Sequence, residues 1–558
     1  MIPLRSPNQV MRLKRLGAAH QTRLSFMRVL LRGLRRGGWQ CDRPVWSIDA
    51  QGVGHAVYRV RGQGQAYSLV AFAHELPDEL RSDRVIATAW DATFALVDGE
   101  AKPDDIARLA GNVPLQEAGR ISDRELVLSR ANRSARLWTH VVERLSEGLQ
   151  PDACQLEDVG YLMRTTAVYG SGKFGAADHT VFAGRPLLDG PFRAEMLTVW
   201  LIRAFVVDLV EHIARARGGA RAARLNPDLK RRLGIGNSTG LGMAPFLVHH
   251  PGLLNAWIMA RETAIARVRS RPSSTACERT CFRQMLDRTT EMIAGWRCDD
   301  RFQAQKLDRL RQDLSRLADH VDRNVLDQPT PWDQLWLWAE VNLSAEGQEL
   351  TLSLMLEPFG EEVDDLAETM CADEVTAFCI DGGMSVAGLA EALSQHYGWA
   401  LSADYSVPEA CTHFWYVSEA KLEPRLGDRH KDAGSEREQP LDVARAAAAL
   451  DRCLAEVPTD LSVAAFLRRY PEHRWIARRI QMSRTSPYSE IRDNLIGSDL
   501  LPVDMLRCKL SFFGATRFDP RSDRWVRITM YQNAPFPDEL HIVPEDDWIL
   551  PKLAGAAA

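Results

Sequence analysis

The chain has 558 residues, of which 45% are hydrophobic and 26% are charged. This balance is typical of a globular protein and excludes a disordered or collagen-like chain. The formal net charge of -5 is too small, over this length, to attract nucleic acid or an anionic membrane, so charge alone predicts neither partner. A chain this long is expected to fold as two or three packed substructures.

The ten cysteines show no paired short spacing of the kind that structural zinc sites use. With no signal peptide, the cysteines are predicted to be reduced thiols in a cytoplasmic protein. No apolar run is long enough to span a bilayer, because charged residues interrupt the best one, Met196 to Ile213. No histidine spacing predicts a metal site and no motif identifies a cofactor.

Residues 1–50 alternate arginines with leucines and methionines at helical spacing. This pattern predicts a basic amphipathic helix whose apolar stripe packs on the body while its arginines face water. The alternatives are a helix that lies on a membrane or binds an acidic partner, and a cleaved transit peptide.

Residues 51–100 are rich in Val, Tyr, Phe and Thr, which predicts a small antiparallel sheet with a hairpin turn at GQGQ. Residues 101–326 return to helical patterns, including the long segment Pro191 to Arg217. They form the expected helical middle of the chain.

Residues 327–558 are expected to form a mixed α and β portion, beginning where Pro329 and Pro331 break the helical pattern. The alternating run LWLWAEVNLSAEGQELTLSLML predicts paired strands, and the polar stretch 427–440 predicts an exposed loop. The runs RCKLSFFGATRFDP and RWVRITMYQ predict two more strands. The whole chain is therefore predicted to be α+β and predominantly helical.

Two glycine-rich stretches carry the functional prediction, RTTAVYGSGKFGAADH (164–179) and GIGNSTGLGMAPFLVHH (234–250). Glycines let backbone N–H groups approach a ligand closely, and N–H groups at a following helix start attract anions. The first stretch lacks the P-loop spacing, and the second matches the dinucleotide fingerprint only in part. The competing interpretation is that both are turns between helices, with Ser and Thr as helix caps.

If the two stretches converge, they supply a cationic, hydroxyl and phenolic set suited to a carboxylate or phosphate. The predicted catalytic residues are Lys173, Ser238, Thr239 and Tyr169. The predicted substrate-binding residues are Arg164, Thr165, Ser171, Asn237 and His413.

His413 comes from a third segment, Asp404 to Arg425, in which a histidine and nearby glutamates could serve as acid and base. Its alternative is a strand whose aromatic residues fill the core. The C-terminal strands alternate basic and aromatic residues, but neighbouring aspartates offset the charge, so we expect a surface hairpin and no nucleic acid there.

These observations predict a cytoplasmic enzyme that acts on a small anionic metabolite by lyase or hydrolase acid–base chemistry, with homo-oligomerisation left open. The alternative is a non-catalytic binding or assembly protein that uses the basic N-terminal helix. A further alternative is a flavin- or metal-dependent oxidoreductase without a sequence fingerprint. The cofactor stays unknown.

Overall fold

The computed structural model describes residues 2–550 except 81–88, 113–121, 136, 171–172, 175–181, 238–249, 372–378, 406–414, 419–422, 427–438, 493–500 and 521–525. The chain is α+β with helices predominant. It divides into two compact units. Unit 1 holds residues 1–19, 241–512 and 520–526, and unit 2 holds residues 20–240, 513–519 and 527–558. The stretch Asp327 to Asp333, expected to separate two domains, lies within unit 1.

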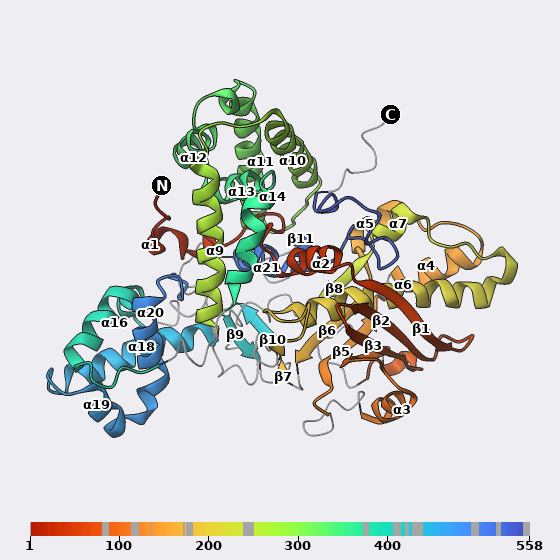
Figure 1. Cartoon of the computed structure of the whole chain (residues 1–558), viewed down its shortest axis with the longest axis horizontal. Helices are drawn as coiled ribbons and strands as arrows, with labels where there is room; N and C mark the ends of the chain where they lie inside the picture. Colours follow the sequence, from red (N-terminus) through yellow and green to blue (C-terminus); the bar gives the residue numbers. More distant parts are fainter. Residues whose placement is uncertain are drawn as a thin grey trace. The chain divides into compact units, whose positions relative to one another are not determined.

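Unit 2 is built on a ten-stranded mixed sheet, whose first strands are seen side by side in Figure 1. Its main path runs in the order β1-β2-β3-β4-β5-β6-β8-β12-β11, and β7 pairs with β6. The strands are β1 (Gln40–Ile48), β2 (Gly54–Gly62), β3 (Gln65–Ala73), β4 (Ala92–Asp98), β5 (Glu125–Arg133), β6 (Tyr161–Gly170), β7 (Lys173–Phe174), β8 (Gly234–Asn237), β11 (Ala515–Pro520) and β12 (Val526–Met530). The expected N-terminal antiparallel strands are thus part of a larger sheet.

The hairpin expected at GQGQ joins β2 to β3 through Gln63 and Gly64, both of which have positive φ. Two central residues with positive φ are what a tight hairpin turn with the right-handed strand twist requires.

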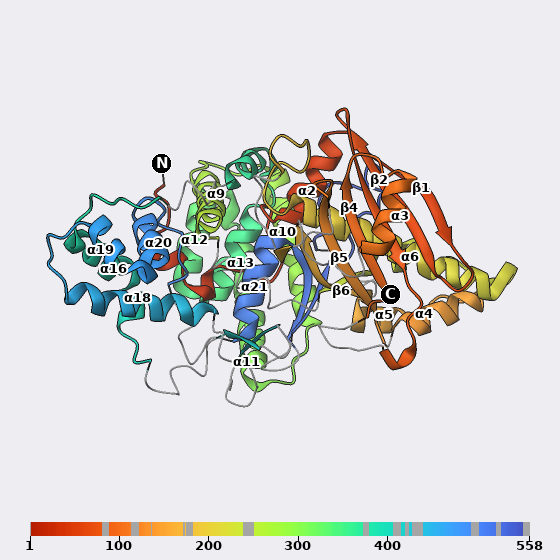
Figure 2. The same cartoon turned by 90° about the horizontal axis from the view of Figure 1, so that it is seen from below.

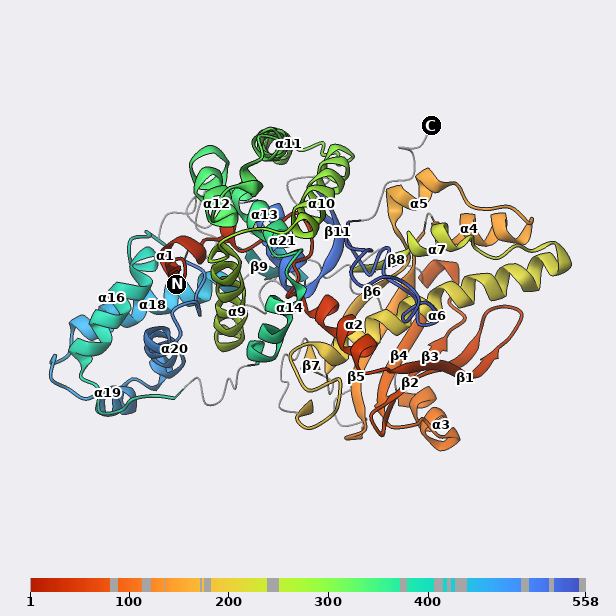
Figure 3. The same ribbon diagram turned by 45° about the horizontal axis from the view of Figure 1, so that its top comes forward.

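The two faces of this sheet are covered by different helices, α6 (Arg193–Gly218) and α3 (Pro103–Asn112) (Figure 3). Phe94 points to α6, where its ring centroid lies 5.6 Å from that of Phe205. The next residue, Ala95, packs in a cluster with Leu109 of α3. This alternation is the period of two that a strand buried on both faces shows. The other helices of unit 2 are α2 (Phe26–Arg36), α4 (Leu137–Ser146), α5 (Ala153–Val159) and α7 (Pro227–Arg231).

Three of the N-terminal arginines do not face water as predicted, whereas Arg12 and Arg36 are exposed. On and beside α2, Arg23, Arg28 and Arg32 surround Asp546 of the C-terminal segment at 3.0 to 3.4 Å, and Arg28 is fully buried. The prediction of water-facing arginines is wrong for these three because the sequence spacing does not reveal a carboxylate more than 500 residues away.

Unit 1 is helical, and Figure 2 shows α16, α18, α19 and α20 grouped within it. Its helices are α1 (Pro7–Val10), α9 (Pro251–Arg269), α10 (Ala276–Ala294), α11 (Arg301–Val321), α12 (Pro331–Asn342), α13 (Ala345–Met355), α14 (Gly360–Val363), α16 (Val386–Leu401), α18 (Gln439–Ala455), α19 (Val463–Arg469), α20 (Arg474–Thr485) and α21 (Pro502–Phe513). A short hairpin pairs β9 (Trp415–Ser418) with β10 (Glu423–Leu426).

Two strand predictions in the C-terminal half are wrong. The alternating run 335–356 forms α12 and α13, because the buried residues Trp332, Leu335, Trp336 and Ala339 follow helical spacing. Ser344 starts the second helix, since its hydroxyl accepts a hydrogen bond from the Gly347 N–H at 3.3 Å. The first half of RCKLSFFGATRFDP belongs to α21, and only its second half is strand β11.

Within the described ranges, no helix is both long and apolar enough to cross a membrane. The cysteines that the structure describes are free thiols.

Candidate functional site

The two glycine-rich stretches begin as neighbouring strands of unit 2. Strands β6 and β8 pair in parallel, with Arg164 opposite Gly236 and Thr165 opposite Asn237. Parallel strands leave a sheet at the same edge, and in open α/β sheets ligands bind outside the carboxyl ends of such strands. The start of the first stretch is therefore strand, where the sequence predicted loop.

Arg164 and Thr165 point to opposite faces because they are successive residues of one strand. The side chain of Arg164 is half-buried and its stem crosses Gly236, where a Cβ would lie 2.8 Å from the Arg164 Cγ. Glycine is thus required at position 236. Thr165 is buried, and its hydroxyl donates to the Gly236 carbonyl at 3.4 Å. Its role is structural, between two strands.

Tyr169 and Lys173 lie farther along the same hairpin, in the backbone pairs Tyr169↔Phe174 and Gly170↔Lys173. Arg164 and Tyr169 are paired with Asn132 and Leu128, which are four steps apart on β5, a distance of roughly 13 Å. One small ligand at Arg164 therefore does not span both positions. Of the other predicted residues, Asn237 is placed by its backbone on β8, while Ser171, Ser238, Thr239 and His413 lie outside the described residues.

A row of polar side chains crosses the sheet beside Arg164, on the face that carries α3. Alternation along each strand places His74 with Phe72, Thr93 with Ala95, and Arg130 with Leu128. We call the group His74, Thr93, Arg130 and Arg164 the polar row. Thr93 is paired with Arg130 across β4 and β5, and Arg164 is paired with Asn132 across β5 and β6.

The two guanidinium groups of the polar row stem from adjacent strands. Arg164 on β6 is paired with Asn132 on β5, and Arg130 is two residues from Asn132 on β5. This puts the Cα atoms of Arg130 and Arg164 roughly 8 Å apart. Both side chains are half-buried, and Arg130 lies over the Trp90 ring at 4.8 Å from its centroid. Side chains of this length at this spacing can bind the same carboxylate or phosphate.

At the other end of the row, the His74 Nε2 lies 2.7 Å from the Thr93 hydroxyl. Burial lowers the pKa of His74 below its usual 6.5, and the nearby Asp91 carboxylate only partly opposes this effect. The imidazole is therefore neutral at neutral pH, the form that can take a proton. Thr93 is fully buried, so it orients His74 and is not itself an accessible nucleophile.

The end of the β4–β5 ladder is fixed by two side chains next to the row. The Asn132 Oδ1 accepts a hydrogen bond from the Asp91 N–H at 3.1 Å, and the Asp91 carboxylate accepts one from the Arg133 N–H at 2.9 Å. Asp91 also lies 3.5 Å from the Arg133 Nε. These contacts hold the strands that carry Thr93 and Arg130 in register.

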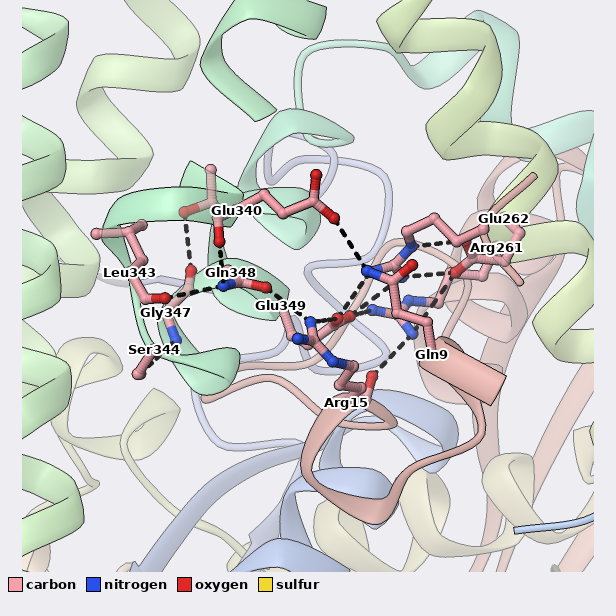
Figure 4. Close-up of polar contacts among 12 residues, drawn as sticks. Gln9, Arg15, Arg261, Glu262, Glu340, Leu343, Ser344, Gly347, Gln348 and Glu349 are labelled. Atoms are coloured by element: carbon pink, nitrogen blue, oxygen red, sulfur yellow. Dashed lines mark hydrogen bonds and ion pairs between the residues drawn. The ribbon is translucent and has the colours of Figure 1, made fainter. Parts of the chain in front are cut away.

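Unit 1 holds a second group of charges, of which Figure 4 labels Arg15, Arg261, Glu262 and Glu349. Within it, Arg5 lies between Glu262 and Glu349. Its guanidinium contacts the two carboxylates at 2.7 and 2.8 Å, and Arg261 and Arg15 also pair with Glu349. Burial alone would raise the pKa of Glu349, but these guanidiniums outweigh it and hold the pKa at about 2. Arg5, Glu262 and Glu349 are buried and Arg5 pairs with both carboxylates, so these charges have partners within the protein and the network is structural.

The part of the chain that the structure describes has no group of three or more His, Cys, Asp or Glu residues arranged to hold a metal ion. Comparison with protein-family models, curated proteins and solved structures finds no match. The polar row thus stands on its own geometry.

Sequence reasoning identified Arg164 but missed His74, Thr93 and Arg130. Thr93 and Arg130 are marked by polar residues inside otherwise apolar runs, AWDATFALV and LVLSRANR, and His74 stands at the end of the apolar run SLVAFAH. Such residues interrupt one face of a buried strand and leave the other apolar.

Proposed function

We propose that the chain is a cytoplasmic enzyme that binds a small anionic metabolite, a carboxylate or a phosphate, on the polar row. Arg130 and Arg164 neutralise the anion, and His74 transfers a proton in a lyase- or hydrolase-type reaction. The observation that carries the proposal is that strand pairing brings these two arginines to one face of the sheet with a neutral imidazole. Proton transfer by a histidine at neutral pH requires such an unprotonated ring.

The glycine-rich stretches support this proposal through their starting points. Strand β8 ends at Asn237, one residue after Gly236, which is paired with Arg164. Ser238, Thr239 and Asn237 are therefore proposed to complete the anion site, and Tyr169, Ser171 and Lys173 to form a separate part of it farther along β6.

The alternative of an assembly protein that uses the basic N-terminal helix needs accessible arginines. Arg28 and Arg32 are buried in ion pairs, which reduces the basic surface that this alternative needs, while Arg12 and Arg36 are exposed. An oxidoreductase with a flavin is distinguished by the visible absorption spectrum of the purified protein.

Binding of inorganic phosphate and of succinate, measured by isothermal titration calorimetry, tests the proposal. The Arg164→Gln variant is expected to bind roughly 10- to 100-fold more weakly, which is the loss of one or two hydrogen bonds to a charged group. Arg61→Gln, an exposed arginine of β2 in the same sheet, is the matched control and is expected to bind like the wild type. Equal affinities in all three proteins would rule the polar row out as the anion site.

A further inference from the structure

The helices α19 and α20 of unit 1 carry a cluster of exposed arginines that the polar row does not use. Between residues 468 and 484 the sequence RRYPEHRWIARRIQMSR has six arginines and one glutamate. Arg479 is buried and pairs with Glu490. The other five are exposed, and we call them the arginine surface: Arg468, Arg469, Arg474, Arg478 and Arg484.

None of these five arginines forms an ion pair with a described residue, although most buried and half-buried arginines of the chain do. Arg469 lies over the ring of Tyr470, and Arg484 lies within hydrogen-bond distance of the Met384 sulfur. Glu472 is the acidic residue within this segment. The surface therefore keeps its positive charge, which the small net charge of the whole chain conceals.

On α20, Arg474 and Arg478 are four residues apart and so lie on the same side of the helix. Like charges at this spacing destabilise a helix, and no acidic residue of α20 offsets them. Trp475 is next to them and is 46% exposed, which is unusual for so large an apolar side chain. The opposite side of the helix packs in the core through Ile476, Ala477 and Ile480.

We infer that the arginine surface binds the phosphate backbone of a single-stranded nucleic acid. Guanidinium groups pair with phosphates in two parallel hydrogen bonds, and an exposed indole next to them offers a base a face on which to stack. An anionic membrane would also attract the arginines. It fits less well, because Trp475 is the single large apolar side chain exposed on α20, whereas a membrane-bound helix needs a whole apolar face turned outward. The sequence predicts no nucleic acid as a partner, and this inference differs because it rests on the local charge of the arginine surface and not on the net charge of the chain.

The test is fluorescence anisotropy of a labelled single-stranded oligonucleotide of about 20 nucleotides, longer than one binding module covers, titrated with the full chain at several salt concentrations. The double variant Arg474→Gln with Arg478→Gln is expected to weaken binding and to lower the slope of log K against log salt by about 1.4, the contribution of two phosphate contacts. Trp475→Ala is expected to weaken binding roughly tenfold with the slope unchanged.

The control is Arg301→Gln with Arg309→Gln, two exposed arginines of α11, which is expected to bind like the wild type. All the substituted side chains are exposed, and circular dichroism checks that each variant is folded. The inference is overturned if the wild type does not bind the oligonucleotide at low salt, or if the α11 and α20 variants lose affinity equally. It is also overturned if the wild type sediments with phosphatidylserine vesicles and binds no oligonucleotide.

Discussion

Replacing Arg5 by Met tests how the N-terminal segment is held in unit 1. Arg5 donates four hydrogen bonds to Glu262 and Glu349, at 2.7 to 3.3 Å, in a buried site. Without Arg5, Glu349 keeps Arg261 and Arg15, but Glu262 keeps only the Arg261 Nη1 at 4.0 Å. Breaking a buried pair costs about 3 to 5 kcal/mol, and we expect the lower value, about 3 kcal/mol, because one carboxylate stays compensated.

The measurement is hydrogen exchange of α9 and α13, which carry the two glutamates, followed by mass spectrometry. Arg5→Met is expected to speed exchange there, and Glu262→Gln added to it is expected to recover part of the protection, because the unpaired buried charge is then removed. Arg15→Met, at the edge of the network with a contact of 3.4 Å to Glu349, is the control and is expected to cost under about 1 kcal/mol. Unchanged protection in Arg5→Met, or no recovery in the double variant, would refute this account.

Acid unfolding gives the same network a second test. The pKa of Glu349 is about 2 in the folded chain and 4.5 without its partners, so the unfolded chain binds the proton first as the pH falls. The stability that Glu349 contributes is therefore fully present above pH 4.5 and is lost as the pH falls from 4.5 toward 2. In Arg5→Met the folded pKa of Glu349 is expected to rise toward 4.5, so this pH-dependent loss is expected to be smaller and to be complete at a higher pH.

Three further predictions concern unit 2. Glu195 is buried, its carboxylate oxygens have no hydrogen-bond partner among the described residues, and burial raises its pKa to about 8. The stability of the chain is therefore expected to fall as the pH rises from 4.5 to 8. Glu195→Gln is expected to abolish this fall, as measured by thermal unfolding curves. Asp546→Asn removes the carboxylate that lies 3.0 Å from the buried Arg28 and is expected to cost about 3 kcal/mol, seen as faster proteolysis of the C-terminal segment. Because the pKa of His74 is lowered in the folded chain, the unfolded chain takes up a proton at His74 more readily than the folded chain as the pH falls below 6.5. This uptake lowers the free energy of unfolding, and His74→Gln is expected to reduce that loss. The three predictions would be contradicted, in the same order, by an unchanged pH profile of stability in Glu195→Gln, an unchanged cleavage rate in Asp546→Asn, and an unchanged dependence of stability on pH just below 6.5 in His74→Gln.

The sequence allowed the first strands of the sheet to be predicted because each shows its own local signal. The turn at Gln63 and Gly64 and the β-branched and aromatic runs around it need no distant partner to be recognised. The helices α12 and α13 were predicted as strands, since alternation of Leu and Trp mimics a period of two when the true burial pattern follows every third or fourth residue.

The candidate site was harder to predict because it is made by strand pairing. Arg164 was identified from its glycine-rich surroundings, but Arg130 comes from a strand that precedes it by 34 residues and His74 from one still earlier. The register that brings them together is a property of the sheet, set by pairs such as Thr93 with Arg130, and no local pattern encodes it. The same holds for the pairing of Asp546 with Arg28.

The central claim is that Arg130 and Arg164 hold an anion on one face of the sheet. A crystal structure of the protein with selenate, whose anomalous scattering locates the ion, tests it directly. The account predicts an anomalous peak within hydrogen-bond distance of both guanidinium groups, absent in Arg164→Gln. A peak elsewhere, or none at this face in the wild type, would contradict it.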